Sequence, residues 1–429
     1  MPSDVQPPRG MRDFLPADKA LRDAVMGVIR DTFASYGYRE IETPVAEDLG
    51  RLESGQGGDN EKLIYKILRR GLDADVPLRL AQATDLGLRF DLTLPLSRFY
   101  ATHRAELPSV FRSTQIAPVW RAERPQKGRY RQFVQCDIDV LGEASEMAEI
   151  ELIAATMASL ERLGIDSTSV RINDRRLLSG LLDACGVDAA DQPRVLITID
   201  KLDKIGVGGV ADELRASVPA GPAQQLIAVI EAVAGTVGDG DFDATLAVLP
   251  RGIDGPVAAL VAIRDALAVV APGVNLVADP TLVRGQGYYT GTIFELANPA
   301  SAGSVGGGGR YDNMIGRFAG VDVPACGSSL GFERIVELVD PERFASRGRA
   351  VAVLYDTDVD PAVVVGWQRR LIADGLSARL VRRGRNQGRI LKELAADGLE
   401  SYLSVSATTP APTPGGATPE LRALRAETP

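Results

Sequence analysis

The segment VWRAERPQKGRYRQFVQCDIDV, residues 119–140, carries the densest group of polar side chains in the strand-like part of the chain. Apolar and polar residues alternate at both of its ends and charged residues crowd its middle, so it predicts two antiparallel strands joined by a basic loop. Alternate side chains of a strand share a face, and Arg121 and Glu123 are therefore expected to point the same way. The same rule places three residues of the returning strand on one face: Gln135, Asp137 and Asp139.

The charges of this hairpin are of a kind that binds a phosphorylated ligand. A guanidinium is a planar fork of donors that matches phosphate oxygens, and carboxylate and amide neighbours can fix a small polar ligand beside it. The segment is rich in cations: Arg121, Arg124, Lys127, Arg129 and Arg131. A charged hairpin that is merely solvated remains the alternative for this segment taken by itself.

Strand-like patterns also precede the hairpin, in LRLAQATD (78–85) and LRFDLTLP (88–95), and QIAPVWRAE (115–123) leads into its first strand. Their alternation predicts further strands of an antiparallel sheet. In the second of them, Asp91 and Thr93 are expected to share one strand face among apolar residues, where a carboxylate needs a partner. An internal salt bridge with one of the arginines is the alternative to a ligand site for Asp91.

The chain before these strands opens with a helix. Apolar residues recur at helical spacing over residues 20–36, Gly37 then ends the helix, and YREIETPVAE (38–47) predicts a strand. After the hairpin a second helix is predicted over residues 145–164. The Ala-, Leu- and Asp-rich region that follows, with one strand-like stretch VRIND, predicts a mainly helical insertion.

Strand patterns resume at residue 274, so chain beyond the insertion is expected to complete the first sheet. In LVRGQGYY, Gly285 and Gly287 flank Gln286, and glycines inside a strand mark a bulge or a close approach of backbone to a ligand. The glycine run 306–309 predicts a phosphate cradle or a tight turn. It lacks the GxxxxGK[ST] pattern of a Walker-type site.

Two further patterns complete the chain. GSSLGFERIV predicts a glycine-led turn into a helix with Arg334 near its start, where a surface arginine is the alternative to a binding role. Beyond residue 341, short strands and helices alternate as in a small parallel α/β unit, and a tail rich in Pro, Thr and Ala predicts an extended linker with a short helix at most. We therefore expect an α+β protein divided into a first part of the core (1–165), a helical insertion (166–272), a second part of the core (273–341), an α/β domain (348–406) and a tail (407–429).

The amino-acid composition argues against several classes of protein. The chain has 429 residues, 45% hydrophobic and 24% charged, as in ordinary globular proteins, and no stretch approaches the ~20 consecutive apolar residues of a membrane span. The amino terminus lacks the apolar core of a signal peptide, so a cytoplasmic protein is expected. Cys136, Cys185 and Cys326 are too scattered for a disulfide framework or a zinc site.

The net charge and the histidine content exclude further classes of function. The formal net charge of −9 argues against a general coat for nucleic acid, so any RNA contact must come from a local basic patch. His103 is the one histidine of the sequence, which leaves none for a catalytic pair with Cys or Ser or for a multi-histidine metal site. The chemistry is therefore expected to rest on Arg, Asp, Glu, Gln, Tyr and backbone groups.

Taken in order, these segments resemble the class II aminoacyl-tRNA synthetases, and specifically the histidyl-tRNA synthetase family. PRGMRDFLP (8–16) is similar to the family's N-terminal signature, GYREIETPVAED (37–48) to the dimer-forming motif 1, and the hairpin 119–140 to motif 2. GSSLGFERI (327–335) resembles motif 3, while LVRGQGYYTGTIFE and GGGRYD resemble two segments peculiar to the histidine enzymes. Each segment is of modest specificity, but six of them in the right order make coincidence improbable.

The resemblance implies a fold and a reaction. The fold is an antiparallel six-stranded sheet flanked by helices, with an insertion domain between motifs 2 and 3 and a C-terminal α/β anticodon-binding domain. In the reaction, the carboxylate of L-histidine attacks the α-phosphate of ATP to give histidyl-adenylate and pyrophosphate, and the histidyl group then passes to the 3′ end of tRNA(His). The resemblance also implies that Mg²⁺ neutralises the outer phosphates, although no metal site made by the protein is predicted. Motif 1 implies a homodimer. Phosphoryl chemistry needs positioning and charge neutralisation more than acid or base groups, which suits an arginine-rich site.

The resemblance also implies roles for single residues. Arg284 and Arg121 are the implied catalytic arginines, both acting on the α-phosphate. The implied ATP site consists of Arg121, Glu123 on the adenine side, Arg129, and Arg334 at the γ-phosphate. The implied histidine site consists of Asp91, Thr93, Gln135, Asp139, Tyr288 and Tyr289. Gln126 and Lys127 are implied to meet the acceptor end of the tRNA. Fixed acceptors for the two ring nitrogens of histidine would reject analogues that leave a buried carboxylate unpaired.

The chain departs from the family pattern in two places. It reads RGQGYY where the family usually reads RGLDYY, so Gln286 and Gly287 replace a leucine and an aspartate beside Arg284. The C-terminal domain is short, although it keeps a basic patch made of Arg382, Arg383, Arg385, Arg389 and Lys392. Two other functions stay open at this point: a synthetase-like regulatory subunit of ATP phosphoribosyltransferase, and an enzyme that adenylates histidine for an acceptor other than tRNA.

Overall fold

The computed structural model describes residues 5–54, 60–72, 79–125, 128–283, 288–344, 350–413 and 419–424. The chain divides into two compact units, Met1–Phe344 and Ala345–Pro429. Among the described residues, no helix is both long enough and apolar enough to cross a membrane.

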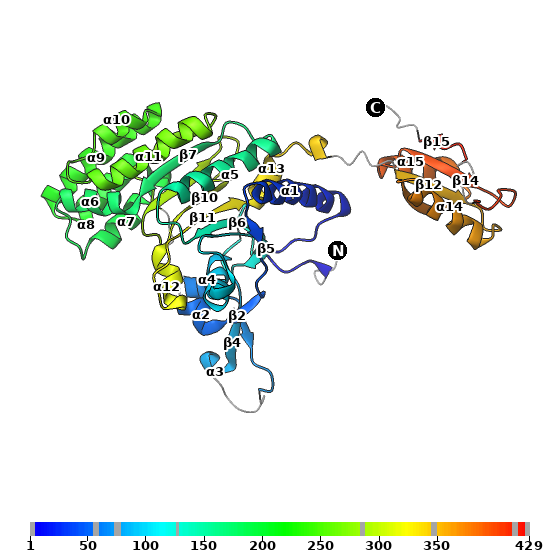
Figure 1. Cartoon of the computed structure of the whole chain (residues 1–429), viewed down its shortest axis with the longest axis horizontal. Coiled ribbons are helices and arrows are strands. Elements are labelled where there is room, and N and C mark those ends of the chain that lie inside the picture. The colour runs from blue at the N-terminus through cyan, green and yellow to red at the C-terminus, as the bar shows by residue number, and fades with distance from the viewer. Residues whose placement is uncertain are drawn as a thin grey trace. The chain divides into compact units, whose positions relative to one another are not determined.

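The first unit is built around a mixed sheet with eight described strands (Figure 1). In sheet order they are β1 (Arg39–Glu40), β5 (Phe111–Trp120), β6 (Gln132–Leu141), β11 (Ala325–Gly331), β10 (Gly306–Arg310), β9 (Thr292–Ala297), β7 (Ser169–Asp174) and β8 (Asn275–Ala278). The six strands from β5 to β7 pair antiparallel. The expected antiparallel core is therefore confirmed, and β1 and β8 add one parallel strand at each edge.

Helices cover both faces of this sheet (Figure 1). The first face packs against α1 (Pro16–Ser35), α5 (Met147–Leu163), α11 (Asp254–Val270) and α13 (Phe332–Leu338). The second face packs against α4 (Thr93–His103) and α12 (Asp312–Ala319). Alternation along β6 produces this division, because Ile138 lies in the first core and Leu141 in the second. Gln135, Asp137 and Asp139 therefore belong to the second face, which we call the site face.

The insertion is helical, as predicted, but it begins later than residue 166. Its helices are α6 (Arg175–Ala184), α7 (Gln192–Ile199), α8 (Leu202–Ser217), α9 (Ala220–Asp239) and α10 (Phe242–Ala247), followed by α11. Residues from α6 to α9 form an apolar core of their own. The strand-like stretch VRIND is β7 of the main sheet, so this part of the predicted insertion belongs to the sheet instead.

The chain between β1 and β5 forms a second, three-stranded sheet. Its strands, in sheet order, are β2 (Ala46–Asp48), β4 (Thr84–Leu88) and β3 (Lys66–Leu68). The same part of the chain contains α2 (Leu49–Ser54), α3 (Leu80–Ala83) and the 3₁₀ turns η2 (Asn60–Leu63) and η3 (Arg104–Glu106). The single strand predicted for residues 38–47 was wrong: β1 and β2 are separate strands in different sheets. The strand predicted for LRLAQATD is only partly right, because residues 80–83 form the helical turn α3 and β4 begins at Thr84.

The strand predicted for LRFDLTLP was also wrong. Strand β4 ends at Leu88 and helix α4 begins at Thr93. The Asp91 carboxylate accepts a hydrogen bond from the Leu94 backbone N–H at 3.2 Å, and Pro95 occupies the first turn of the helix, where its missing N–H costs nothing. Asp91 and Thr93 therefore lie in a turn and at a helix start rather than on one strand face.

The glycine run is neither a turn nor a phosphate loop, because it forms the buried strand β10. A Cβ added at Gly308 would lie 2.0 Å from the carbonyl oxygen of Gly327, and one added at Gly327 would lie 2.1 Å from Asp139 Oδ1. Because these glycines have no side chain, β10 can pair closely with β11, and the Asp139 carboxylate has room beside Gly327.

The first unit ends in the 3₁₀ turn η4 (Pro341–Phe344), and the second unit has the predicted order of elements. These are β12 (Ala350–Tyr355), α14 (Pro361–Ala373), β13 (Ser377–Arg382), α15 (Gln387–Ala396) and β14 (Ser401–Val405), with β12, β13 and β14 parallel. The short tail helix that we allowed for is absent from the described part of the tail. Instead β15 (Arg422–Ala423) pairs with β14, and the Trp367 indole N–H donates to the Pro410 carbonyl at 2.9 Å.

Candidate active site

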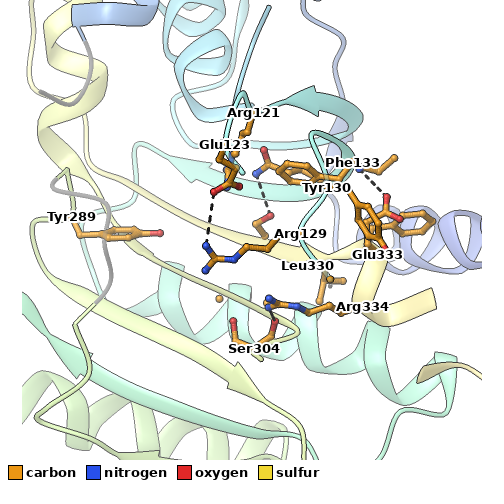
Figure 2. A pocket seen from close by; sticks show the side chains of 18 of the residues that line it. Arg121, Glu123, Arg129, Tyr130, Phe133, Tyr289, Ser304, Leu330, Glu333 and Arg334 are labelled. Atoms are coloured by element: carbon orange, nitrogen blue, oxygen red, sulfur yellow. Dashed lines mark hydrogen bonds and ion pairs between the residues drawn. The ribbon is translucent and has the colours of Figure 1, made fainter. Parts of the chain in front are cut away.

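A cavity of about 380 Å³ opens over β6, β10 and β11 on the site face (Figure 2). Seven of the predicted site residues line it: Arg121, Glu123, Arg129, Gln135, Tyr288, Tyr289 and Arg334. They come from the motif 2 hairpin, from the end of the segment before β9, and from α13. The fold therefore brings together residues that are up to about two hundred positions apart in the chain.

Arg121 is held at the start of the hairpin loop, directly after β5. Its Nε donates to the Phe90 carbonyl at 3.0 Å, and its guanidinium lies 5.0 Å from the centre of the Phe133 ring. Among the described residues its terminal nitrogens have no hydrogen-bond partner, so they remain available to a ligand. The strand alternation predicted for Arg121 and Glu123 stops at Trp120, yet both side chains reach the same cavity.

Arg334 and Arg129 form a second cationic group of the cavity (Figure 2). Arg334 donates to the Ser304 carbonyl, and its pKa is lowered, first by burial and then by the positive charge of Arg129. Arg129 lies 3.8 Å from the Glu123 carboxylate. Arg334 is half-buried and Arg129 is exposed, and an anion between them would offset the repulsion of their like charges. The surface role considered for Arg334 is thus replaced by a place in the cavity wall.

Three buried carboxylates lie close enough to act on one another and stand outside the cavity lining: Asp91, Asp137 and Asp139. Burial raises the pKa of Asp91 to about 6, against the opposing effects of the Leu94 N–H and the Arg121 charge. Burial raises the pKa of Asp139 to about 7, against the hydrogen bond donated by the Tyr311 hydroxyl. The pKa of Asp137 is raised well above its usual value, first by burial and then by Asp139.

These carboxylates indicate a cationic ligand. None of the three forms a salt bridge with a described residue, so the internal ion pair considered for Asp91 is not formed there; Arg121 acts on it only through its charge. A buried carboxylate without a cation is costly, and an ammonium or imidazolium group would relieve that cost.

Gln135 joins the carboxylates to the cavity. Its Nε2 lies 3.3 Å from Asp137 Oδ2 and 3.5 Å from Ser329 Oγ, so its amide donors face the acids. Its Oε1 is buried and has no partner among the described residues, which leaves an unused acceptor beside the cavity. Tyr288 and Tyr289 pack at 4.6 Å between ring centres, and Tyr288 lies edge-on against Tyr311 at 5.9 Å.

The remaining predicted residues stand apart from this lining. Asp91 and Asp139 lie behind the wall of the cavity, and Thr93 is half-buried at the start of α4. Arg284, Gln126 and Lys127 lie outside the described residues, as do Gln286 and Gly287.

Sequence reasoning did not select four residues that belong to this site. The sequence placed Asp137 on one strand face with Gln135 and Asp139, but we assigned it no role there. Tyr130, Ser329 and Glu333 line the cavity with no pattern in the sequence that singles them out.

Comparisons with known proteins agree with this geometry. Residues 10–335 match the family model described as histidyl-tRNA synthetase. The histidine–tRNA ligase of Leifsonia xyli is 53% identical over 423 residues, which cover 96% of this chain and 97% of that protein. The probable histidine–tRNA ligase of Tropheryma whipplei is 42% identical over 422 residues, covering 95% and 97%.

Solved structures show the same fold. The histidyl-tRNA synthetase from Nostoc sp. superimposes with a TM-score of 0.74 at 25% identity, covering 94% of this chain and 92% of that one. An ATP phosphoribosyltransferase regulatory subunit/histidyl-tRNA synthetase from Bacillus halodurans has a TM-score of 0.75 at 19% identity, covering 95% and 100%, and supports the fold alone. The chain belongs to the histidyl-tRNA synthetase family.

Proposed function

We propose that this chain is a histidine–tRNA ligase, which activates L-histidine with ATP to histidyl-adenylate and transfers the histidyl group to the 3′ end of tRNA(His). The observation that carries the proposal is that a group of arginines lines the cavity, while a group of buried carboxylates lies behind its wall next to Gln135. Phosphates need the first group and an amino acid with an ammonium and an imidazole needs the second. The full-length relatives named as ligases favour this function over the regulatory subunit.

ATP would place its phosphates among the arginines. In this proposal Arg121 neutralises the charge that develops on the α-phosphate, and Arg334 with Arg129 holds the outer phosphates. Glu123 is proposed for the adenine side. Arg284 remains the second proposed catalytic arginine through the family resemblance alone.

Histidine would occupy the part of the cavity between Gln135 and the tyrosine pair. Its ammonium is proposed to face Gln135 Oε1, Asp91 and Thr93. Its ring nitrogens are proposed to face Asp139 and the two tyrosines, Tyr288 and Tyr289. Ring analogues that lack a donor would leave a buried carboxylate unpaired, which is the basis of strong rejection.

Mg²⁺ is proposed to enter with ATP rather than to occupy a site of the protein. Among the described residues, Glu123 and Glu333 are the carboxylates that line the cavity, and both already face arginines. Glu123 faces Arg129, and Glu333 binds Arg22 and Arg12. Mg²⁺ commonly takes its ligands from substrate phosphates and water when few carboxylates are free. Its proposed role is to neutralise the outer phosphates.

The tRNA contacts are proposed on two parts of the chain. Gln126 and Lys127 of the motif 2 loop are proposed for the acceptor end, and the C-terminal unit for the anticodon. The basic patch of that unit is partly neutralised, because Arg383 pairs with Asp356 and Arg389 pairs with Glu393. We therefore expect anticodon binding that is weaker and more sensitive to salt than the patch's five cations suggest.

A homodimer formed through motif 1 and a cytoplasmic location are also part of the proposal. Strand β1 of this motif is short and exposed at the edge of the main sheet. Light scattering should give twice the mass of the chain, and a monomer would contradict the dimer.

One preparation can test the proposed function. Histidine-dependent ATP–pyrophosphate exchange and charging of tRNA(His) should both occur. Exchange without charging would indicate an acceptor other than tRNA. Absence of both, together with binding to a catalytic ATP phosphoribosyltransferase subunit, would indicate the regulator.

A further inference from the structure

The N-terminal segment contacts the motif 2 loop although more than a hundred residues separate them. The backbone N–H of Arg131 donates to the Gly10 carbonyl at 2.8 Å, and Arg131 Nη1 donates to the Arg9 carbonyl at 3.4 Å. Arg131 also links the two ends of the motif 2 loop, because its Nε donates to the Glu123 carbonyl at 3.0 Å. Residues 9–14, which we call the N-terminal clamp, therefore support the loop that carries Glu123, Arg129 and Tyr130.

Gly10 makes this close approach possible. Its φ is +85°, and a Cβ added to it would lie 2.7 Å from Pro125 Cγ and 2.9 Å from Arg131 Cγ. Only glycine fits both the backbone conformation and the space.

Arg12 is the centre of the clamp, because it touches two walls of the cavity. Its guanidinium carbon lies 3.3 Å from the centre of the Tyr130 ring, and one of its terminal nitrogens pairs with the Glu333 carboxylate. Tyr130 belongs to the motif 2 loop, while Glu333 precedes Arg334 in α13. Figure 2 shows Tyr130 and Glu333 near each other on the side of the cavity away from Tyr289.

Glu333 has more positive partners than it can neutralise. It accepts from Arg22 at 2.7 and 2.8 Å, from the Val134 backbone N–H at 3.2 Å, and from Arg12. Burial would raise the pKa of Glu333, but Arg22 and Arg12 hold it below its usual value. One carboxylate thus serves two guanidinium groups, and the excess positive charge lies beside a cavity that is proposed to take ATP.

The two arginines differ in their surroundings. The Arg22 side chain is 7% exposed and forms a two-point pair with Glu333, as expected of a structural ion pair in the core. The Arg12 side chain is 31% exposed, and its Nε is buried without a partner among the described residues. Loss of Arg12 would leave Glu333 with Arg22 and the Val134 N–H, so we expect the fold to tolerate it.

We propose that Arg12 is a positioning residue for ATP: it fixes Tyr130 and the motif 2 loop relative to α13, so that Arg129 and Arg334 face the same ligand. The inference rests on the proposed function, since it assigns the arginine side of the cavity to ATP. Arg12 acts through Tyr130 and Glu333 and need not touch the nucleotide.

The test is histidine-dependent ATP–pyrophosphate exchange by the full chain, with KM measured separately for ATP and for histidine. Arg12→Gln should raise the KM for ATP about 10-fold, as expected from the loss of one stacked, charged contact, while the KM for histidine and the Tm stay near the wild-type values. Arg12→Lys keeps a positive charge for Glu333 but loses the planar stack on Tyr130. Its KM for ATP should therefore lie between those of the wild type and Arg12→Gln.

A double substitution and a matched control sharpen the test. Tyr130→Leu should raise the KM for ATP in the wild-type background. It should add little to the effect of Arg12→Gln, because each substitution removes the same contact between Arg12 and Tyr130. Arg264 of α11 is a suitable control, because it does not line the cavity and its surroundings match those of Arg12. Its guanidinium carbon lies 5.1 Å from the centre of the Phe242 ring, it pairs with Asp243, and its side chain is 26% exposed. Arg264→Gln should leave both KM values unchanged.

The outcomes separate the inference from the proposed function. Exchange by the wild type with an unchanged KM for ATP in Arg12→Gln would overturn the positioning role. Equal rises in both KM values with a lower Tm would also overturn it and show a structural role. Absence of exchange in the wild type would instead overturn the proposed function.

Discussion

Arg129 and Arg334 face one cavity with like charges, and the charge of Arg129 adds to burial in lowering the pKa of Arg334. Among the described residues, Arg334 has only the Ser304 carbonyl as a hydrogen-bond acceptor. The charge of Arg334 therefore costs stability in the free protein, first through burial and then through Arg129, and a polyphosphate can recover that cost on binding.

Substitution of Arg334 should weaken ATP binding without weakening the fold. Arg334→Gln removes the repulsion with Arg129, so the Tm should stay level or rise, while the KM for ATP should rise by about 10- to 100-fold. Exchange assays and thermal melts of the same preparation measure both. A fall in Tm with an unchanged KM would show that Arg334 serves the fold instead.

Substitution of Arg121 should affect the chemical step more than binding. Arg121→Ala removes donors aimed at the developing charge on the α-phosphate, and we expect kcat for adenylate formation to fall roughly 10²- to 10³-fold. Arg121→Lys keeps the charge but not the fork, so it should recover only part of the rate. Single-turnover formation of adenylate distinguishes this from slow product release, and full activity of Arg121→Lys would contradict a need for the planar group.

The buried Asp139 should make the fold less stable as pH rises. Its folded pKa is about 7, above the ordinary value of 3.8, so between these pH values the folded protein holds a proton that the unfolded chain has lost. The stability that this proton gives is full below about pH 4 and is lost as pH rises through 7.

Asp139→Asn keeps an acceptor for the Tyr311 hydroxyl and removes the titration. Its Tm should exceed that of the wild type at pH 8, by several degrees as an order of magnitude, and the difference should shrink at pH 5. Melts across this range measure it. A Tm difference that is the same at both pH values would contradict the assigned titration.

The close approach of β10 and β11 makes a further prediction. A methyl group at Gly327 would meet Asp139 Oδ1 at 2.1 Å, so Gly327→Ala should displace that carboxylate, raise the KM for histidine, and lower stability by about 1–3 kcal/mol. Gly221→Ala in helix α9 is the control, because a Cβ there meets nothing within 4 Å. It should be neutral or stabilising. Equal effects of the two substitutions would show that the contact at Gly327 is relaxed at no cost.

Local patterns predicted much of the fold and part of the site. The alternation along residues 132–141 was sufficient to place Gln135 and Asp139 on one face, because side chains of a strand follow a strict period of two. The same rule failed for Asp91 and Thr93, because Pro95 and the carboxylate of Asp91 favour a helix start that an alternating pattern does not reveal.

Contacts between distant segments could not be predicted. Nothing in the sequence says that Arg12 stacks on Tyr130, or that the glycine run is a buried strand rather than a loop. Both depend on how strands β6, β10 and β11 are arranged in the sheet, and a single sequence does not contain that order. The family resemblance supplied the arrangement that local patterns lacked.

The central claim is that the cavity lined by Arg121, Gln135 and Arg334 adenylates histidine. The most direct measurement is ATP–pyrophosphate exchange by the purified chain with each of the twenty amino acids in turn. We predict exchange with histidine that exceeds exchange with any other amino acid by about 10⁴-fold or more, since the buried carboxylates need the donors of its ring. Absence of exchange with histidine, or comparable exchange with another amino acid, would contradict the claim.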